Sequence, residues 1–244
     1  MTDPLPATPA AHDAEPHDRG AFSDGLNKLR AGVLGANDGI VSVAAVVVGV
    51  AGATSELAPI LTAGAAAVVG GAFSMALGEY VSVASARDSQ TALIEKEKRE
   101  LAEMPEEELA ELAAIYESKG LSRETAQRVA EELTAHDALA AHLSAELHID
   151  ETEVLKPWQA AWASFLAFLL GAVLPMLAIA LPPAELRIPV AFAATLIALG
   201  VTGALGARLG GSPALRPTLR VLVGGALALG VTFAIGSLLG TTIA

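Results

Sequence analysis

Cysteine is absent from the 244 residues of this chain. Disulfide bridges and thiolate metal sites are therefore excluded, and a sulfur ligand can come only from one of the four methionines. Basic residues are scarce as well, because 15 Lys and Arg stand against 27 Asp and Glu, which gives a formal net charge of −12. Such a charge argues against nucleic acid as a partner and suits cations.

Aromatic residues make up only 4% of the chain, yet 53% of it is hydrophobic and its mean hydropathy is +0.52. This composition is too apolar for an ordinary soluble domain and indicates several membrane spans. The sequence contains five apolar runs, each long enough to cross a bilayer, which takes about 20 residues. They cover residues 31–53, 57–83, 158–181, 188–209 and 219–243. The sequence therefore predicts an all-α, polytopic membrane protein with five transmembrane helices.

Residues 85–156, between the second and third runs, are polar and helical in pattern, with 18 acidic and 8 basic residues. A first helix is expected to continue straight out of the second span and to end near Met104. Pro105 suits the first turn of a second helix, which Gly120 can end. Ser122 can cap a third helix. We therefore expect a three-helix domain inserted between transmembrane helices two and three.

The chain divides into four expected parts. They are a disordered N-terminal tail (1–24), the first two spans with the ion path (25–84), the acidic helical domain (85–156) and the last three spans (157–244). Basic residues next to membrane spans are enriched on the cytosolic side. Here they fall on one side of the membrane, except for Arg187. The N-terminus and the acidic domain are thus expected in the cytosol, and the C-terminus outside.

The first two spans contain polar residues that lipid disfavours. Asp38 and Ser42 are four residues apart in the first span, next to Asn37, and Met75 and Glu79 are four apart in the second. A carboxylate at mid-membrane costs roughly 2.5–3.5 kcal/mol on insertion scales, so it suggests function. If the two helices are antiparallel, Asp38, Met75 and Glu79 can meet and offer oxygen and thioether donors to a divalent ion. The alternative is a structural polar pair that locks the two helices together.

Glutamates recur at helical spacing in the polar segment. Glu97 and Glu100 are three residues apart on one expected helix. Glu108 and Glu111 are three apart on the next, and Glu146 lies near the end of the third. Carboxylates that converge from several helices form metal sites in helical proteins. A solvated face crossed by ion pairs would give the same spacing, so both interpretations stay open.

The histidines of this segment give a weaker signal. His136, His142 and His148 are six residues apart and do not share a helix face. His142 could join Glu146, four residues further on, but we expect a surface histidine. The sequence shows no nucleophile–base pair, no glycine-rich phosphate loop and no histidine-based metal site. An enzyme is therefore not expected.

Three motifs resemble the vacuolar iron transporter family: LGANDGIVS in the first span, FSMALGEYVSV in the second, and EKEKREL with PEEELAELAAIYESKGLS in the insert. The match runs from about Leu26 to the C-terminus, and the chain is similar to a bacterial-type member. The resemblance implies five transmembrane helices and a homodimer with the ion path at the subunit interface. It also implies proton-coupled export of Fe2+ or Mn2+ from the cytosol. These ions are the substrate, and no permanently bound cofactor is implied.

The resemblance also implies roles for particular residues. The family's pore residues fall on Asp38 and Met75, with Glu79 beside them. Its cytosolic metal-binding glutamates fall on Glu97, Glu100, Glu108, Glu111 and Glu146. Members known for iron carry methionines near the last of these, where this chain has Leu143 and Ser144. The choice between iron and manganese therefore stays open.

The sequence as a whole predicts a transporter of Fe2+ or Mn2+ in a bacterial inner membrane. Its expected partners are metal ions, protons, lipid and a second copy of the chain. The alternative is a membrane-anchored metal sensor or buffer, which binds the ion without transporting it. Acidic residues within the spans favour the transporter, because a buffer has no need of them.

Overall fold

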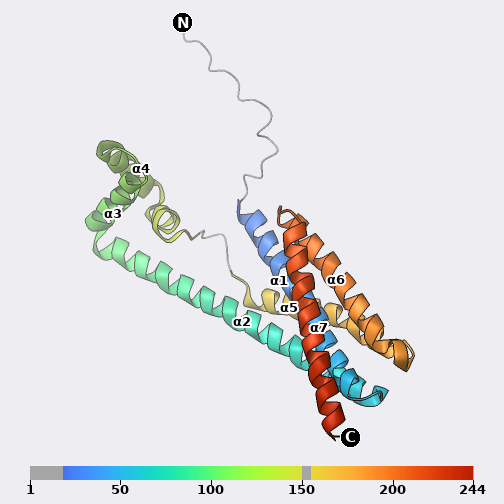
Figure 1. The fold of residues 1–244 in the computed structure, drawn as a ribbon. Helices are drawn as coiled ribbons and strands as arrows, with labels where there is room; N and C mark the ends of the chain where they lie inside the picture. Colours follow the sequence, from blue (N-terminus) through green and yellow to red (C-terminus); the bar gives the residue numbers. More distant parts are fainter. Residues whose placement is uncertain (1–18, 150–154, 244) are drawn as a thin grey trace.

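The computed structural model describes residues 19–149 and 155–243, and every regular element in them is helical. Five helices are long and apolar enough to cross a membrane, which confirms the predicted all-α membrane fold (Figure 1). They are α1 (Arg19–Ala53), α2 (Leu57–Glu103), α5 (Pro157–Ala180), α6 (Arg187–Leu209) and α7 (Leu215–Ile243). Most of the predicted tail, 1–24, lies outside the described residues, and the part from Arg19 onward belongs to α1.

Helix α1 lies at the centre of the bundle and contacts α2, α5, α6 and α7. Val43, Val47 and Val48 on this helix are fully buried. Its glycine Gly39 lies directly against the backbone carbonyl of Phe168 on α5, where a Cβ atom would overlap the oxygen. The absence of a side chain therefore lets α1 and α5 approach closely, as the glycine spacing in the first span permits.

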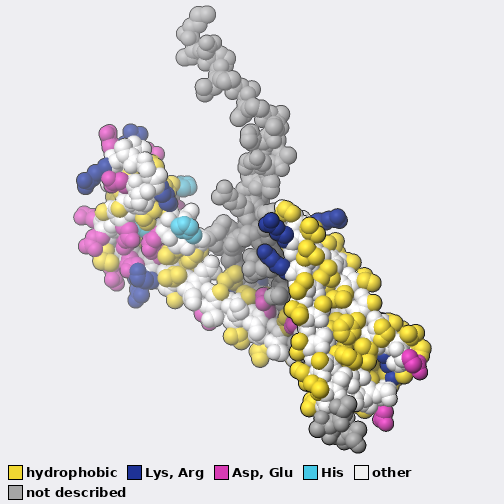
Figure 2. All heavy atoms as spheres, viewed as in Figure 1, with side chains coloured by type: hydrophobic (Ala, Val, Ile, Leu, Met, Phe, Trp, Pro, Cys, Tyr) yellow, Lys and Arg dark blue, Asp and Glu magenta, His cyan; other side chains and the backbone are white. Residues whose placement is uncertain are grey.

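The outer surface of the bundle is apolar (Figure 2). Large hydrophobic side chains such as Leu77 on α2, Leu170 on α5 and Ile197 on α6 are more than half exposed. Such a surface would be unfavourable in water but matches the hydrocarbon of a bilayer. Trp158 and Trp162 are also exposed at the start of α5, the position at which indole rings favour the membrane interface.

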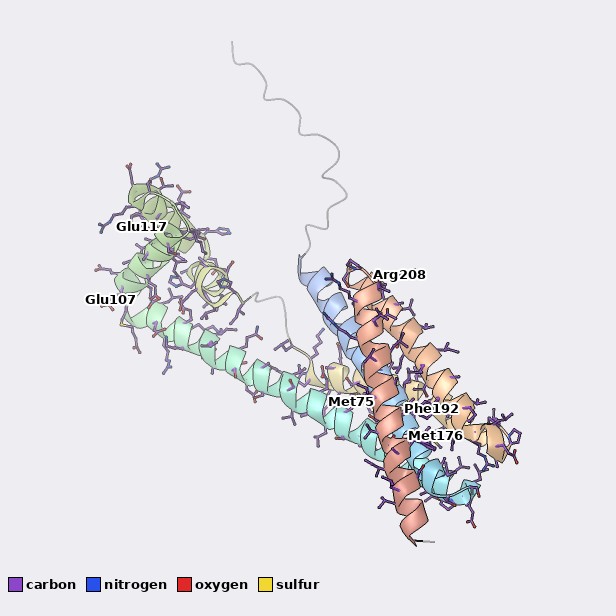
Figure 3. The ribbon with its side chains drawn as sticks, viewed as in Figure 1. Met75, Glu107, Glu117, Met176, Phe192 and Arg208 are labelled. Carbon is purple, nitrogen blue, oxygen red and sulfur yellow. The ribbon has the colours of Figure 1, made fainter. Side chains whose placement is uncertain are left out.

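The ends of the helices sort into two groups. The start of α1, the start of α5 and the turn between α6 and α7 lie at one end of the bundle (Figure 1). Arg208 at that turn is labelled in Figure 3. The C-terminus and the connections α1–α2 and α5–α6 lie at the other end. There Arg187 Nη1 donates a hydrogen bond to the carbonyl of Ser55 at 2.9 Å and ties the two connections together.

Helix α2 runs without interruption for 47 residues and leaves the bundle (Figure 1). Its outer half packs against α3 (Pro105–Ser118) and α4 (Arg123–His142). We call residues 85–149 the polar unit. As predicted, Pro105 occupies the first turn of α3, and Ser122 Oγ accepts a hydrogen bond from the Thr125 backbone N–H. Gly120 has φ +101°, which is the left-handed geometry that a glycine after a helix adopts.

The third predicted helix of the polar unit is not continuous. At Asp137 the backbone leaves the helical region, with φ −160° and ψ 96°. The Asp137 carboxylate accepts a hydrogen bond from the Ala140 N–H at 3.0 Å and caps the short piece that follows. That piece widens into the π-helical turn η1 (Leu143–Leu147) and ends at His148, whose φ is +55°. Lys119 Nζ reaches the carbonyl of Ala145 at 3.4 Å and fixes this turn to α3.

Candidate metal centre and membrane polar residues

Side chains from separate elements of the polar unit converge on one buried point. Glu97 comes from α2, Glu108 from the first turn of α3, and His142 from the end of α4. One ligand atom of each lies within 4.8 Å of the other two. His142 Nδ1 is 2.9 Å from Glu97 Oε1, 3.6 Å from Glu108 Oε2 and 3.6 Å from an oxygen of Glu146 on η1. The arrangement offers one nitrogen and several carboxylate oxygens to a cation.

The prediction that His142 is a surface histidine is wrong. Its side chain is 0% exposed, whereas His136 and His148 are exposed. The physical reason is the break at Asp137 and the wide turn after His142, which an ideal helical wheel cannot represent. These two irregularities turn His142 and Glu146 toward the glutamates of α2 and α3. Short π-helical turns are frequent at functional sites in helices.

Three atoms at this point lack hydrogen-bond partners among the described residues: Glu97 Oε1, His142 Nδ1 and His142 Nε2. The 2.9 Å contact between the first two is close, but it does not have the direction of a hydrogen bond. Buried polar atoms are nearly always paired in folded proteins, so such a group calls for an explanation. A bound cation would supply the missing partner for Glu97 Oε1 and for one ring nitrogen.

The electrostatics of the unit agree with this interpretation. Burial raises the pKa of the Glu97 carboxyl above its ordinary value, and the negative charge of Glu146 adds to the effect. Burial likewise raises the pKa of Glu108, with a further contribution from Glu111. The nearby His142 works in the opposite direction at both glutamates. Carboxylates crowded in this way repel one another, and a bound divalent cation would replace this repulsion with attraction to its positive charge.

The remaining predicted glutamates lie further from this point. Glu100 is half-buried and its Oε2 pairs with Lys96 Nζ at 2.6 Å. Glu111 is exposed, and Glu95 pairs with Lys98 at 3.0 Å. Helix α2 thus has a solvated, ion-paired side as well as the side that carries Glu97. Whether Glu100 and Glu111 ligate an ion stays a prediction.

In the membrane bundle, Asp38 is satisfied by its own helix. Its Oδ1 accepts a hydrogen bond from Ser42 Oγ at 2.6 Å, and both side chains are half-buried. The neighbouring Asn37 makes the link between helices, because its Oδ1 accepts a hydrogen bond from Thr202 on α6. This hydrogen bond joins α1 to α6, so it differs from the polar pair between the first two spans that the sequence left as an alternative. Asp38 takes no part in this hydrogen bond.

Met75 lies on α2 inside the bundle (Figure 3). A Cβ atom built on Gly35 would be 3.4 Å from its sulfur, which places Met75 about one helical turn from Asp38 along α1. Glu79 is half-buried one turn further along α2. The adjacent Tyr80 packs its ring against Trp158 at 4.8 Å between centroids. The meeting of Asp38, Met75 and Glu79 at one ion position stays a prediction.

Sequence reasoning missed Thr202 as the partner of Asn37. The signal was weak, since Thr195 and Thr202 both interrupt the apolar run of α6. The Asn37 partner is 165 residues away in the sequence. For His142 the available signal is its i,i+4 spacing to Glu146, which alone is insufficient to predict burial.

The profile of the VIT family matches residues 29–237 of this chain. The chain belongs to the VIT family. It is 44% identical over 201 residues to a protein of Acanthamoeba castellanii named vacuolar iron transporter, covering 82% of this chain and 74% of the relative. It is 36% identical over 213 residues to vacuolar iron transporter homolog 2 of Arabidopsis thaliana, covering 87% and 84%. The VIT-like transporter 1b of Glycine max is 33% identical over 215 residues, covering 88% and 77%. Membership of the VIT family supports metal ion transport across a membrane.

Proposed function

We propose that this VIT-family protein exports Fe2+, Mn2+ or both from the cytosol in exchange for protons. In this proposal the polar unit captures the ion, and the polar residues of α1 and α2 pass it through the membrane. The transporting form is a homodimer. The metal ion is the substrate in both places, and protons move in the opposite direction.

The observation that carries the proposal is the continuity of α2. This single helix holds Met75 and Glu79 within the bundle and Glu97 in the polar unit, with no break between them. At about 1.5 Å per residue, Glu79 and Glu97 are separated by roughly 27 Å along the helix. An ion bound at Glu97 is thus held at a fixed place relative to the membrane helices, on the side where α2 leaves the bundle.

The polar residues of α1 and α2 in the membrane bundle have the chemistry needed to pass a divalent ion across the membrane. Asp38 offers a carboxylate oxygen and Met75 a thioether sulfur, a combination that accepts both harder and softer divalent ions. Glu79 is half-buried and supplies a second carboxylate that can take up a proton when the ion departs. Ser42 holds one oxygen of Asp38 and fixes the direction of the carboxylate.

The homodimer has a physical argument of its own. Asn37, Asp38 and Ser42 are each only half-buried in a single chain. A partly exposed carboxylate facing hydrocarbon is costly, and a second copy of the chain would cover it. An ion path between two copies would in addition bring two Asp38 carboxylates to one ion.

The charges at the two ends of the bundle support the orientation that export from the cytosol requires. Arg208, Arg216 and Arg220 lie at or near the α6–α7 turn, at the same end as the start of α1. Basic residues concentrate on the cytosolic side, so we assign this end and the polar unit to the cytosol. We place the protein in a bacterial inner membrane, with its C-terminus outside.

Flux into proteoliposomes tests the proposal. Purified protein with its polar unit facing outward should take up Fe2+ or Mn2+ into the lumen, and faster when the lumen is acidic, because protons then leave as ions enter. Empty liposomes and proteoliposomes treated with a protonophore are the controls. A protein that binds the ions in these vesicles but moves neither one, with or without a pH gradient, would instead be a metal sensor or buffer.

A further inference from the structure

The polar unit contains an imidazole among its glutamates, and this changes which ions it should prefer. We infer that His142 is a direct ligand of the captured ion and the residue that sets its specificity. With Glu97 and Glu108 it forms a mixed nitrogen and oxygen site. Such a site favours ions that bind nitrogen well, such as Fe2+ and Co2+, over Mn2+. The identity of the ion as cargo rests on the proposed function, whereas the ligation itself does not.

The first support is geometric. His142 is fully buried, and its Nδ1 faces oxygens of Glu97, Glu108 and Glu146 at 2.9 to 3.6 Å. Glu97 and Glu108 are themselves buried, with 2% and 5% of their surface exposed. A ligand atom from each of the three residues lies within 4.8 Å of the others, so one ion can touch all of them.

The second support is the lack of ordinary partners. Neither ring nitrogen of His142 has a hydrogen bond among the described residues. A buried imidazolium would need acceptors for both of its N–H groups, and leaving one unpaired is costly. A neutral ring with its Nδ1 lone pair directed at an ion leaves only the Nε2–H without a partner. The geometry thus fits a ligand better than a positively charged counter-ion of the glutamates.

The consequence for specificity comes from ligand chemistry. Oxygen ligands suit Mn2+ and Mg2+, whereas imidazole suits Fe2+, Ni2+, Cu2+ and Zn2+. Affinity generally rises from Mn2+ through Fe2+ to Co2+ for a given set of donors. Replacing the nitrogen by oxygen should therefore cost the later ions more than it costs Mn2+. His142 would then separate Fe2+ from Mn2+ without a thioether ligand at this site.

The test uses the full-length protein in detergent and two matched variants, His142→Asn and His136→Asn. His136 is exposed on the same helix, so its variant controls for loss of a histidine elsewhere. Pulsed electron paramagnetic resonance on bound Mn2+ detects the nitrogen of a coordinating imidazole. Calorimetric titration with Mn2+ and with Co2+ measures the two affinities. Asparagine is smaller than histidine, but its amide group can lie near the position of Nδ1 and offers oxygen in place of ring nitrogen.

We expect the imidazole nitrogen signal in the wild type and in His136→Asn, and its loss in His142→Asn. Co2+ affinity should fall by at least about tenfold in His142→Asn, since even residues behind the ligands cost this much, and Mn2+ affinity should fall less. A wild-type spectrum without imidazole nitrogen overturns the inference, whether or not the variant folds. So does a His142→Asn protein that binds both ions unchanged or more tightly, as removal of a counter-ion would predict. Wild-type protein that transports Fe2+ without the nitrogen signal refutes this inference alone, whereas the signal without any flux refutes the proposed function alone.

Discussion

The membrane bundle and the polar unit both contain buried or half-buried acidic residues, but the hydrogen-bond partners of these residues differ between the two regions. In the bundle, Asp38 accepts a hydrogen bond from Ser42 on its own helix and belongs to no described ion pair. In the polar unit, Glu97, Glu108 and His142 come from three helices and crowd together, and neither Glu97 Oε1 nor either ring nitrogen has a hydrogen bond among the described residues. Crowded ligand atoms without hydrogen bonds destabilise the unit until an ion binds. Such a site is suited to tight binding of the ion. A single satisfied carboxylate is suited to brief contact with an ion that moves on.

The two regions are also stabilised by different interactions. The bundle is held by close contacts between apolar helices and by the hydrogen bond from Thr202 to Asn37. The polar unit has a small apolar core of its own around Leu112, Ala113, Ala130 and Ala145. Loss of the cluster should therefore change binding and the local stability of the unit. Loss of Asp38 should change transport and leave the bundle intact.

The largest expected effect is that of Asp38→Ala on transport. The variant should abolish ion flux while the protein still inserts and folds, because removal of a carboxylate from this depth eases insertion. Proteoliposome flux and size-exclusion chromatography measure the two outcomes. Thr202→Val is the matched control, since it removes the Asn37 hydrogen bond and should lower stability by about 1 kcal/mol while flux persists. Full flux in Asp38→Ala would remove the proposed path.

The double variant Glu97→Gln with Glu108→Gln should have the next largest effect, on binding. Calorimetry on the full-length protein should show at least about tenfold weaker binding of Co2+ or Mn2+, because the variant removes two charged ligands. Flux should slow without being abolished, because these residues deliver the ion and do not form the path. Unchanged affinity would mean that these two buried glutamates do not ligate the ion.

The same variant has a pH dependence with a definite sign. The folded unit holds the pKa values of Glu97 and Glu108 above the ordinary value of 4.5, so it binds these protons more tightly than the unfolded chain does. Without metal, stability should therefore fall as pH rises from about 4.5 through the raised pKa values. The protection factors for amide hydrogen exchange in residues 97–147, which correct for the intrinsic effect of pH, should fall over that window in the wild type and should change less in the double variant. A wild-type unit that becomes more protected as pH rises would contradict this.

A smaller effect is expected from Met75→Leu. The substitution nearly conserves volume and should cost less than about 1.5 kcal/mol if only packing is involved. If the sulfur contacts the ion, Fe2+ flux should fall more than Mn2+ flux, because Mn2+ gains less from a thioether. Met176, which packs against Gly64 about three helical turns from Met75 along α2, provides the control variant Met176→Leu. If Met75→Leu transports both Fe2+ and Mn2+ at the wild-type rates, Met75 is not part of the ion path.

The smallest effect is expected from Glu111→Gln. This variant tests which of the predicted glutamates of the polar unit ligate the ion. Glu111 is exposed and acts on the cluster only by raising the pKa of Glu108. Its variant should weaken ion binding less than Glu108→Gln does in the same calorimetric titration. A loss as large as that of Glu108→Gln would show that Glu111 moves inward to ligate the ion.

The sequence predicted the features that depend on local patterns. Apolar runs located the five spans, and Pro105, Gly120 and Ser122 marked the turns of the polar unit where the structure has them. The helical spacing of the glutamates gave a set of five candidates that includes Glu97 and Glu108, the two that the structure buries. Each of these signals lies within a few residues of its effect, so a single sequence is sufficient to detect it.

The features that the sequence missed depend on irregular backbone or on distant partners. His142 is buried because α4 breaks at Asp137 and then widens into a π turn, and regular helical spacing predicts neither. Asn37 locks α1 to α6 through Thr202, a partner that only the tertiary packing of the bundle identifies. Which of several glutamates lie inward was likewise decided by how α2, α3 and α4 pack together.

The division between capture and passage is tested most directly by measuring bound ion and transported ion on the same preparation of Asp38→Ala. Full-length variant and wild-type protein are reconstituted, and ion binding to the polar unit and ion flux are determined for each. We predict that Asp38→Ala retains wild-type binding at Glu97, Glu108 and His142 while its flux falls to that of empty liposomes. Loss of binding together with flux, or retention of both, would contradict the division of these two tasks between the polar unit and the membrane bundle.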